Sequence, residues 1–128
     1  MAKQCIKLSD TPANPLAHPA VRAGDYIFVT GQVGAKDDKG NPVEGTEAQA
    51  RQLLETMKKV LKAAGASLDD VVKATVFLVN VKDFAAMNKA YESYFTKDRP
   101  ARSTIIIAGL AYPEWLVEIE CVAYRPQK

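Results

Sequence analysis

Three charged residues near the C-terminus have the types and positions to act on a small acidic molecule. Arg102 lies in the segment Pro100-Ala101-Arg102-Ser103 and leads into a run of threonine and isoleucine residues. A guanidinium group beside such a strand suits planar, two-point binding of a carboxylate. An arginine in an ordinary ion pair fits the same pattern, so Arg102 by itself leaves both interpretations open.

The other two charged residues, Glu118 and Glu120, are two positions apart in a predicted strand over residues 115–124. Alternation places both carboxylates on one face with Val122 and Tyr124. The opposite face is apolar and consists of Val117, Ile119, Cys121 and Ala123. A carboxylate on a mixed face can position a water molecule or move a proton. A solvated edge strand has the same pattern, so this interpretation also stays open.

Metal and thiol chemistry have little support in the composition. The chain has one histidine, His18, and two cysteines, Cys5 and Cys121, which are not spaced as metal ligands. Cys121 is expected to be a buried thiol, since it shares the apolar face of the last strand. The net charge is +2 with the basic residues spread along the chain, so we expect no specific nucleic-acid surface. We also expect no membrane span and a cytoplasmic protein with reduced thiols.

Hydrophobic periodicity predicts two helices that must help to position these residues. The first begins at Thr46, which fits a capping box with Gln49, and Gly65 is a suitable stop. Its apolar stripe consists of Leu53, Leu54, Met57, Val60, Leu61 and Ala64. The second covers about residues 84–96, with Asp83 as a candidate N-cap. Its apolar stripe consists of Phe84, Met87, Tyr91 and Tyr94 or Phe95.

Four segments, 26–33, 71–81, 102–108 and 115–124, are rich in β-branched and aromatic residues and predict strands. Gly31 interrupts the first of them, which indicates a bulge or a close backbone approach. The order of strands and helices predicts an α+β domain over residues 1–128. We expect a single mixed sheet of about six strands with two helices packed on one face.

The strand predicted over residues 71–81 is apolar on both faces. Val72, Ala74, Val76 and Leu78 alternate with Thr75, Phe77, Val79 and Val81. Two helices can cover one face of the sheet, and no further segment remains to cover the other. We therefore predict self-association through the second face. A tightly curled half-barrel that fills its own interior is the alternative.

Several motifs follow one another along nearly the whole chain. The strongest are Pro100-Ala101-Arg102-Ser103, Ala108-Gly109-Leu110 and Val117-Glu118-Ile119-Glu120, and the others lie in residues 24–33, 49–52, 64–73 and 83–95. Together they resemble the Rid family, also called the YjgF family. The resemblance implies a chorismate-mutase-like fold and a homotrimer with clefts between subunits. It also implies hydrolysis of small, carboxylate-bearing enamines and imines, such as 2-aminoacrylate, to 2-keto acids and ammonia, with no metal or organic cofactor.

The resemblance also implies roles for individual residues. Arg102 matches the arginine that grips the substrate carboxylate, and Glu118 matches the glutamate that positions the attacking water. Gly31, Asn88 and Thr104 match positions that line the cleft, and Thr104 would act through its backbone.

Two departures from the family pattern leave the preferred substrate open. Some members have cysteine where this chain has Thr104, and an aromatic residue is often found where it has Ala17, beside His18. The family also has members described as ribonucleases, as translation inhibitors, and as chaperone-like or ligand-binding regulators. These remain the alternatives to an imine deaminase.

Overall fold

Within residues 2–127, which the computed structural model describes, the chain forms six strands and two α-helices. The strands are β1 (Gln4–Ile6), β2 (Ala20–Ala23), β3 (Tyr26–Val33), β4 (Val71–Leu78), β5 (Ala101–Ile106) and β6 (Val117–Tyr124). The α-helices are α1 (Thr46–Ala63) and α2 (Phe84–Tyr94), and two short 3-10 helices are η1 (Leu68–Asp70) and η2 (Val81–Asp83).

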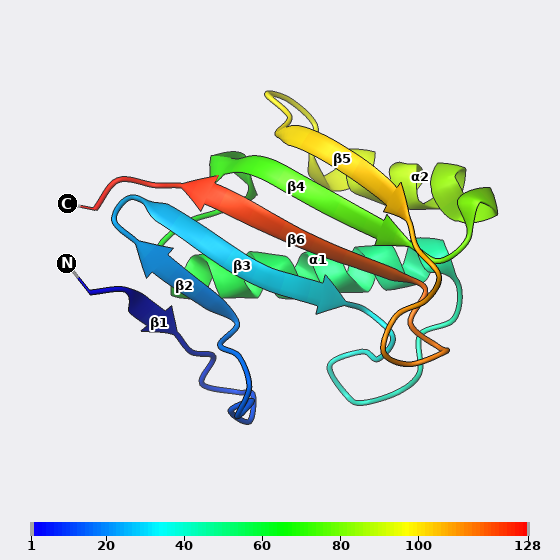
Figure 1. The fold of residues 1–128 in the computed structure, drawn as a ribbon, viewed down its shortest axis with the longest axis horizontal. Helices are drawn as coiled ribbons and strands as arrows, with labels where there is room; N and C mark the ends of the chain where they lie inside the picture. Colours follow the sequence, from blue (N-terminus) through cyan, green and yellow to red (C-terminus); the bar gives the residue numbers. More distant parts are fainter. Residues whose placement is uncertain (1, 128) are drawn as a thin grey trace.

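The strands form one mixed sheet in the order β1-β2-β3-β6-β4-β5. The pair β4 and β5 is parallel, and the other neighbouring strands are antiparallel. Both helices lie behind the same face of the sheet, and the other face is turned toward the viewer (Figure 1). We call the face that the helices do not cover the open face. The predicted α+β architecture, with two helices on one face, is confirmed.

The core lies between the helices and the sheet. The predicted stripe of α1 is buried, with Leu53, Leu54 and Met57 fully inaccessible. The apolar face of β6 is buried as predicted, from Val117 to Ala123. Each such large side chain contributes about 1.5–3 kcal/mol of burial free energy, so this layer positions the strands. None of the helices in residues 2–127 is both long and apolar enough to cross a membrane.

The predicted capping box of α1 is wrong, whereas the predicted N-cap position of Asp83 at α2 is confirmed. Gly45 occupies the N-cap of α1, and the Thr46 hydroxyl donates instead to the Asp83 carboxylate at 2.7 Å. Asp83 is the N-cap residue of α2 but makes no capping hydrogen bond there. The Gln49 side chain donates to the carbonyl oxygens of Val43 and Glu114 and accepts from the backbone N–H of Leu116. The side chains of Thr46 and Gln49 therefore bond to other segments of the chain and not to each other's backbone.

A bulge near the start of β4 corrects the predicted face of Val72. The register jumps from Val71 opposite Ala123 to Lys73 opposite Val122, which leaves Val72 as an extra residue. Val72 is 45% exposed, whereas Ala74, Val76 and Leu78 are buried as predicted. One inserted residue therefore reversed the alternation at that position.

The open face carries large apolar side chains that nothing covers within residues 2–127. Tyr26, Phe28 and Tyr124 are 46%, 49% and 43% exposed, and the rings of Tyr26 and Tyr124 meet edge to face at 5.2 Å. Phe77 and Val122 are half-buried on the same face. The prediction that both faces of the sheet are apolar is confirmed. A contiguous apolar face of this kind is typical of an interaction surface.

Arg22 on β2 joins three parts of the fold through a buried guanidinium group. It is 7% exposed and donates to the carbonyl oxygens of Ala64 at 2.8 Å, Arg125 at 2.8 Å and Gly24 at 3.3 Å. The Ala64 carbonyl lies at the C-terminal end of α1, where a positive charge is favourable.

Replacing Arg22 with methionine is expected to lower the free energy of unfolding by about 3 kcal/mol, because three carbonyl groups lose a charged donor. Urea unfolding monitored by circular dichroism measures this change. Arg125→Gln is the matched control, since it removes only an ion pair to Asp70 whose arginine side chain is 52% exposed. That pair is worth at most about 1 kcal/mol. Equal effects of the two substitutions would contradict the role of Arg22.

Candidate active site

The side chain of Arg102 lies over the aromatic residues of α2. Its guanidinium carbon is 4.7 Å from the ring centre of Tyr91 and 5.9 Å from that of Phe84. Its Nη1 atom is 4.0 Å from the sulfur of Met87. Arg102 takes part in no ion pair within residues 2–127. The ion-pair interpretation of Arg102 therefore has no partner in the described chain, and its donors are available to an anion.

A hollow of about 350 Å³ opens beside Arg102, and we call it the arginine hollow. It is lined by Asn88, Tyr91, Glu92, Arg99, Pro100 and Arg102. Two buried polar atoms, the Asn88 Oδ1 and the Tyr91 hydroxyl, have no hydrogen-bond partner. Buried polar groups are nearly always paired. Two unpaired ones beside a free guanidinium indicate a site whose partners come from outside the described chain.

Gly31 lies at the bulge that the sequence predicted. Thr30 and Gly31 together occupy the place opposite Glu120, between the pairs Val29–Cys121 and Gln32–Ile119. The extra residue turns Gly31 toward the open face, where Glu118 lies. A Cβ atom on Gly31 would be 2.7 Å from the carboxyl carbon of Glu118. The absence of a side chain at Gly31 therefore makes room for the carboxylate.

The Glu118 carboxylate is half-buried on this part of the open face. Burial, with a further contribution from the neighbouring Glu120 charge, raises the pKa of Glu118 above its ordinary value. A carboxylate with a raised pKa is a better proton acceptor near neutral pH than an ordinary glutamate. β6 lies between β3 and β4, so the interpretation as a solvated edge strand is wrong, and of its two glutamates Glu118 is half-buried and Glu120 is exposed.

The N-terminal loop forms a wall next to Gly31. Ala17, His18, Thr30 and Gly31 line one hollow of about 370 Å³. The Thr30 hydroxyl donates to the His18 carbonyl at 2.6 Å, which ties the loop to the bulge. The departure at Ala17 and His18 therefore lies beside Gly31, in a hollow that is also lined by Thr56 and Val60 of α1 and not by Glu118.

The structure places Arg102 and Glu118 on opposite faces of the sheet. Arg102 pairs with Ala74 of β4, whose side chain is buried under the helices. Glu118 pairs with Phe77, whose side chain points to the open face. Paired residues share a face, and two strand spacings of about 4.8 Å also separate β5 from β6. One protomer therefore does not bring these two groups together.

Thr104 lies two residues after Arg102 on the same face of β5, opposite Val76. β5 is the edge strand of the sheet in the described chain, so one side of its backbone is not bonded to a neighbouring strand. Cys121 is buried as predicted, and burial followed by the Glu120 charge raises the pKa of its thiol to about 12. A thiol with such a pKa is protonated at neutral pH and is a poor nucleophile.

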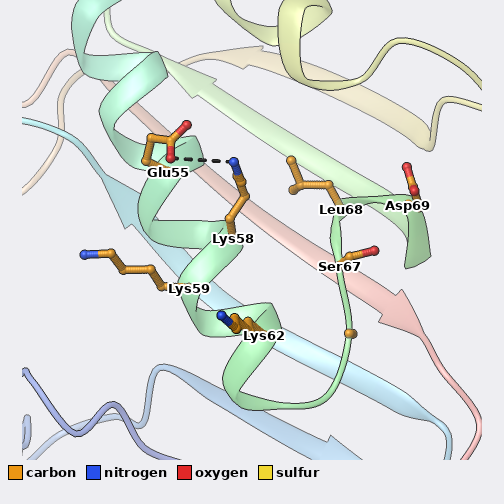
Figure 2. A pocket seen from close by; sticks show the side chains of 8 residues that line it. Glu55, Lys58, Lys59, Lys62, Ser67, Leu68 and Asp69 are labelled. Atoms are coloured by element: carbon orange, nitrogen blue, oxygen red, sulfur yellow. Dashed lines mark ion pairs between the residues drawn. The ribbon is translucent and has the colours of Figure 1, made fainter.

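Another hollow, of about 440 Å³, lies between α1 and η1 (Figure 2). Lys58 pairs with Glu55 at 3.7 Å, and Lys59 points away from Leu68 to pair with Asp38 at 3.1 Å. These charges are already partnered at the surface, and none of the predicted site residues lines this hollow. It is a solvated part of the helix surface.

From the sequence, Tyr91 and Phe84 were predicted only as part of the apolar stripe of a helix, and Arg99 had no predicted role. A signal for Tyr91 was present, since Asn88 and Tyr91 are three residues apart and therefore share a helix face. The docking of that face against Arg102 had no signature in the sequence. Among residues 2–127, no group of three or more His, Cys, Asp and Glu side chains could hold a metal ion.

Known proteins resemble this chain in sequence and in fold. A RutC family protein of Pyrococcus horikoshii is 41% identical over 115 residues, which cover 89% of this chain and 90% of that protein. The 2-iminobutanoate/2-iminopropanoate deaminase of Salmonella typhimurium is 39% identical over 108 residues, covering 82% of this chain and 84% of that one. The crystal structure of the YjgF gene product of E. coli matches with a TM-score of 0.87 at 35% identity, covering 95% and 98% of the two chains.

The family model described as Endoribonuclease L-PSP matches residues 8–125, which is nearly the whole chain. The same region carries the motifs whose order predicted the family. The resemblance found in the sequence is therefore confirmed, and the chain belongs to the Endoribonuclease L-PSP family, also called the YjgF/RutC/Rid family.

Proposed function

We propose that this protein hydrolyses small 2-imino acids, and the enamines that tautomerise to them, to 2-keto acids and ammonia. The observation that carries the proposal is the unpaired guanidinium of Arg102 beside the unpartnered polar atoms of Asn88 and Tyr91. Such a group binds a carboxylate by two parallel hydrogen bonds. The deaminase name of the Salmonella relative supports the same reaction.

The complete site is proposed to form between two copies of the chain. Because Arg102 and Glu118 lie on opposite faces, one protomer would supply Arg102 and its neighbour would supply Glu118 and Gly31. The exposed Tyr26, Phe28 and Tyr124 support burial of the open face against another copy. A closed ring repeats the same unlike contact at each interface. We propose a homotrimer of this kind.

The proposed reaction uses one water molecule. Arg102 holds the carboxylate, so the imine carbon faces a water molecule that is hydrogen-bonded to Glu118. Glu118 accepts a proton as the water oxygen attacks and passes it to the imine nitrogen, which gives a carbinolamine. Glu118 then transfers the proton of the carbinolamine hydroxyl to the nitrogen, the carbon–nitrogen bond breaks, and the keto acid and ammonia form. Because imines also hydrolyse unaided, alignment of the two reactants is the main contribution required of the protein.

A 2-aminoacrylate-generating enzyme, coupled to lactate dehydrogenase, tests this proposal by measuring the rate of pyruvate formation. We expect the protein to accelerate pyruvate release above the spontaneous rate. Binding without acceleration would favour a ligand-sensing or chaperone-like protein, which can use the same arginine. RNA cleavage that Arg102→Ala abolishes would favour a ribonuclease, but the chain has one histidine and a net charge of +2, which do not suggest a basic nuclease groove.

The activity is expected to fall at low pH, with a midpoint above the ordinary pKa of a glutamate, which is about 4.3. The reason is that Glu118 must be ionised to accept a proton, and its pKa is raised. Activity should therefore be lost as the pH falls through that raised pKa. Initial rates against pH, corrected for spontaneous hydrolysis, measure this limb.

Glu120→Gln is the informative control for the pH profile. It removes the neighbouring negative charge that helps to raise the pKa of Glu118. The acid limb should therefore move to lower pH, with the activity retained at neutral pH. An acid limb that stays at the same pH in Glu120→Gln would exclude Glu118 as the titrating group.

A further inference from the structure

Arg99 is a second guanidinium group in the arginine hollow. Its Nε atom donates to the Phe95 carbonyl at 2.7 Å, which fixes the base of the group. Its terminal nitrogens make no other hydrogen bond and no ion pair within the part of the chain that the structure describes. Arg99 is exposed, and its contact with Phe95 leaves both terminal nitrogens available to a ligand.

Arg99 and Arg102 are directed at the same region around Tyr91. Both line the arginine hollow, on either side of Pro100. Both positive charges lower the pKa of Tyr91, against the larger effect of its burial, which raises that pKa. The effect of Arg102 is the larger of the two, and its guanidinium carbon lies 4.7 Å from the ring centre of Tyr91. Two cations on adjacent sides of one hollow can bind two anionic groups of one small molecule.

The hollow has the room and the charge for such a molecule. Its volume of about 350 Å³ is within the usual range for ligand pockets and more than a three-carbon acid fills. Glu92 is the acidic side chain in its lining, and it is exposed and forms no ion pair with either arginine within residues 2–127. A single substrate carboxylate on Arg102 would leave Arg99 without a partner.

We propose that Arg99 binds a second carboxylate, on the side chain of the substrate, and that the protein prefers 2-imino dicarboxylic acids. This specificity rests on the deaminase function proposed above. The reaction is unchanged: one water adds to the imine carbon, the carbon–nitrogen bond breaks, and a 2-keto dicarboxylic acid and ammonia are released. Asn88 and Tyr91 would complete the hydrogen bonds around the bound acid.

The test compares two imines made in place by an amino-acid oxidase. 2-Iminosuccinate, from aspartate, has the second carboxylate, and 2-iminopropanoate, from alanine, lacks it. Keto-acid release is followed for the unmodified protein and for Arg99→Gln. Loss of one charged contact should raise KM for 2-iminosuccinate about tenfold and should change KM for 2-iminopropanoate much less. Glu92→Gln should lower KM for 2-iminosuccinate, since it removes a nearby negative charge.

A binding measurement separates this specificity from the reaction. Calorimetry with oxaloacetate and pyruvate, the two keto-acid products, should show tighter binding of oxaloacetate that Arg99→Gln removes and Arg99→Lys largely keeps. Turnover of both imines with no effect of Arg99→Gln would overturn the specificity and leave the deaminase proposal standing. Arg99-dependent binding of oxaloacetate without turnover of either imine would overturn the deaminase proposal and support the dicarboxylate site.

Discussion

Replacing Arg102 with alanine is expected to reduce keto-acid release to the spontaneous rate. A charged, two-point contact contributes about 1.5–3 kcal/mol, which corresponds to roughly tenfold to a few hundredfold in kcat/KM. The structure leaves Arg102 with no protein carboxylate to replace, since its neighbours are the Tyr91 and Phe84 rings and the Met87 sulfur. The measurement is steady-state pyruvate release from a 2-aminoacrylate-generating enzyme.

Two controls separate loss of carboxylate binding from loss of structure. Arg102→Lys keeps the charge but not the planar pair of donors, so it should recover only part of the activity. Arg125→Gln removes an exposed arginine that does not line the hollow and should leave the rate unchanged. Light scattering checks that each variant keeps the oligomeric state of the unmodified protein. Full activity of Arg102→Ala would remove this residue from the mechanism.

Mixing two inactive variants is expected to restore activity. In a mixed oligomer, the Arg102→Ala copy still has Glu118, and the Glu118→Gln copy still has Arg102. If each site uses one residue from each of two neighbouring copies, random assembly of equal amounts makes about a quarter of the sites intact. Refolding the two variants together and measuring keto-acid release tests this. The effect is large because each variant alone should show only the spontaneous rate.

The control mixture combines the unmodified protein with the double variant Arg102→Ala, Glu118→Gln. A site shared between two copies predicts about a quarter of the full activity, whereas a site within one copy predicts about half. No recovery from the two single variants, together with half activity in this control, would place the site within one protomer. Light scattering that shows a monomer at micromolar concentration would exclude the shared site as well.

Periodicity was sufficient to predict the helices and the central strands. The apolar stripe of α1 repeats with the helical period and gains its free energy by burial against the sheet, so the pattern and the structure agree. The ends of elements were less accurate: the strand predicted over residues 71–81 ends at Leu78, and the helix predicted over 84–96 ends at Tyr94. The short strands β1 and β2 were missed, since each has too few residues for alternation to be visible.

The errors in capping have a physical cause. A capping box is a local pattern, and it predicts well when no stronger partner is near. In this fold Thr46 meets Asp83 from another helix, and Gln49 meets the backbone of two loops. Thr46 and Gln49 can make hydrogen bonds with a local capping partner or with a distant one. Their residue types therefore do not show which partner the fold uses.

For the site, residue types and short-range alternation were enough to predict the chemical groups and much of their local setting. It predicted the guanidinium of Arg102 before a strand, the carboxylate of Glu118 on a mixed face, and a bulge or close approach at Gly31, which the structure confirms. These follow from residue type and from alternation over a few neighbours. The family resemblance supplied the roles, which remain predictions.

The spatial arrangement of these side chains depends on the tertiary structure. The register of β4 with β5 and β6 put Arg102 under the helices and Glu118 on the open face. The docking of α2 put Tyr91 and the unpartnered Asn88 beside Arg102, and it brought Arg99 into the same hollow. Strand register and helix docking depend on contacts between residues far apart in the chain, and a shift of one residue reverses a face. Local patterns therefore do not contain this information.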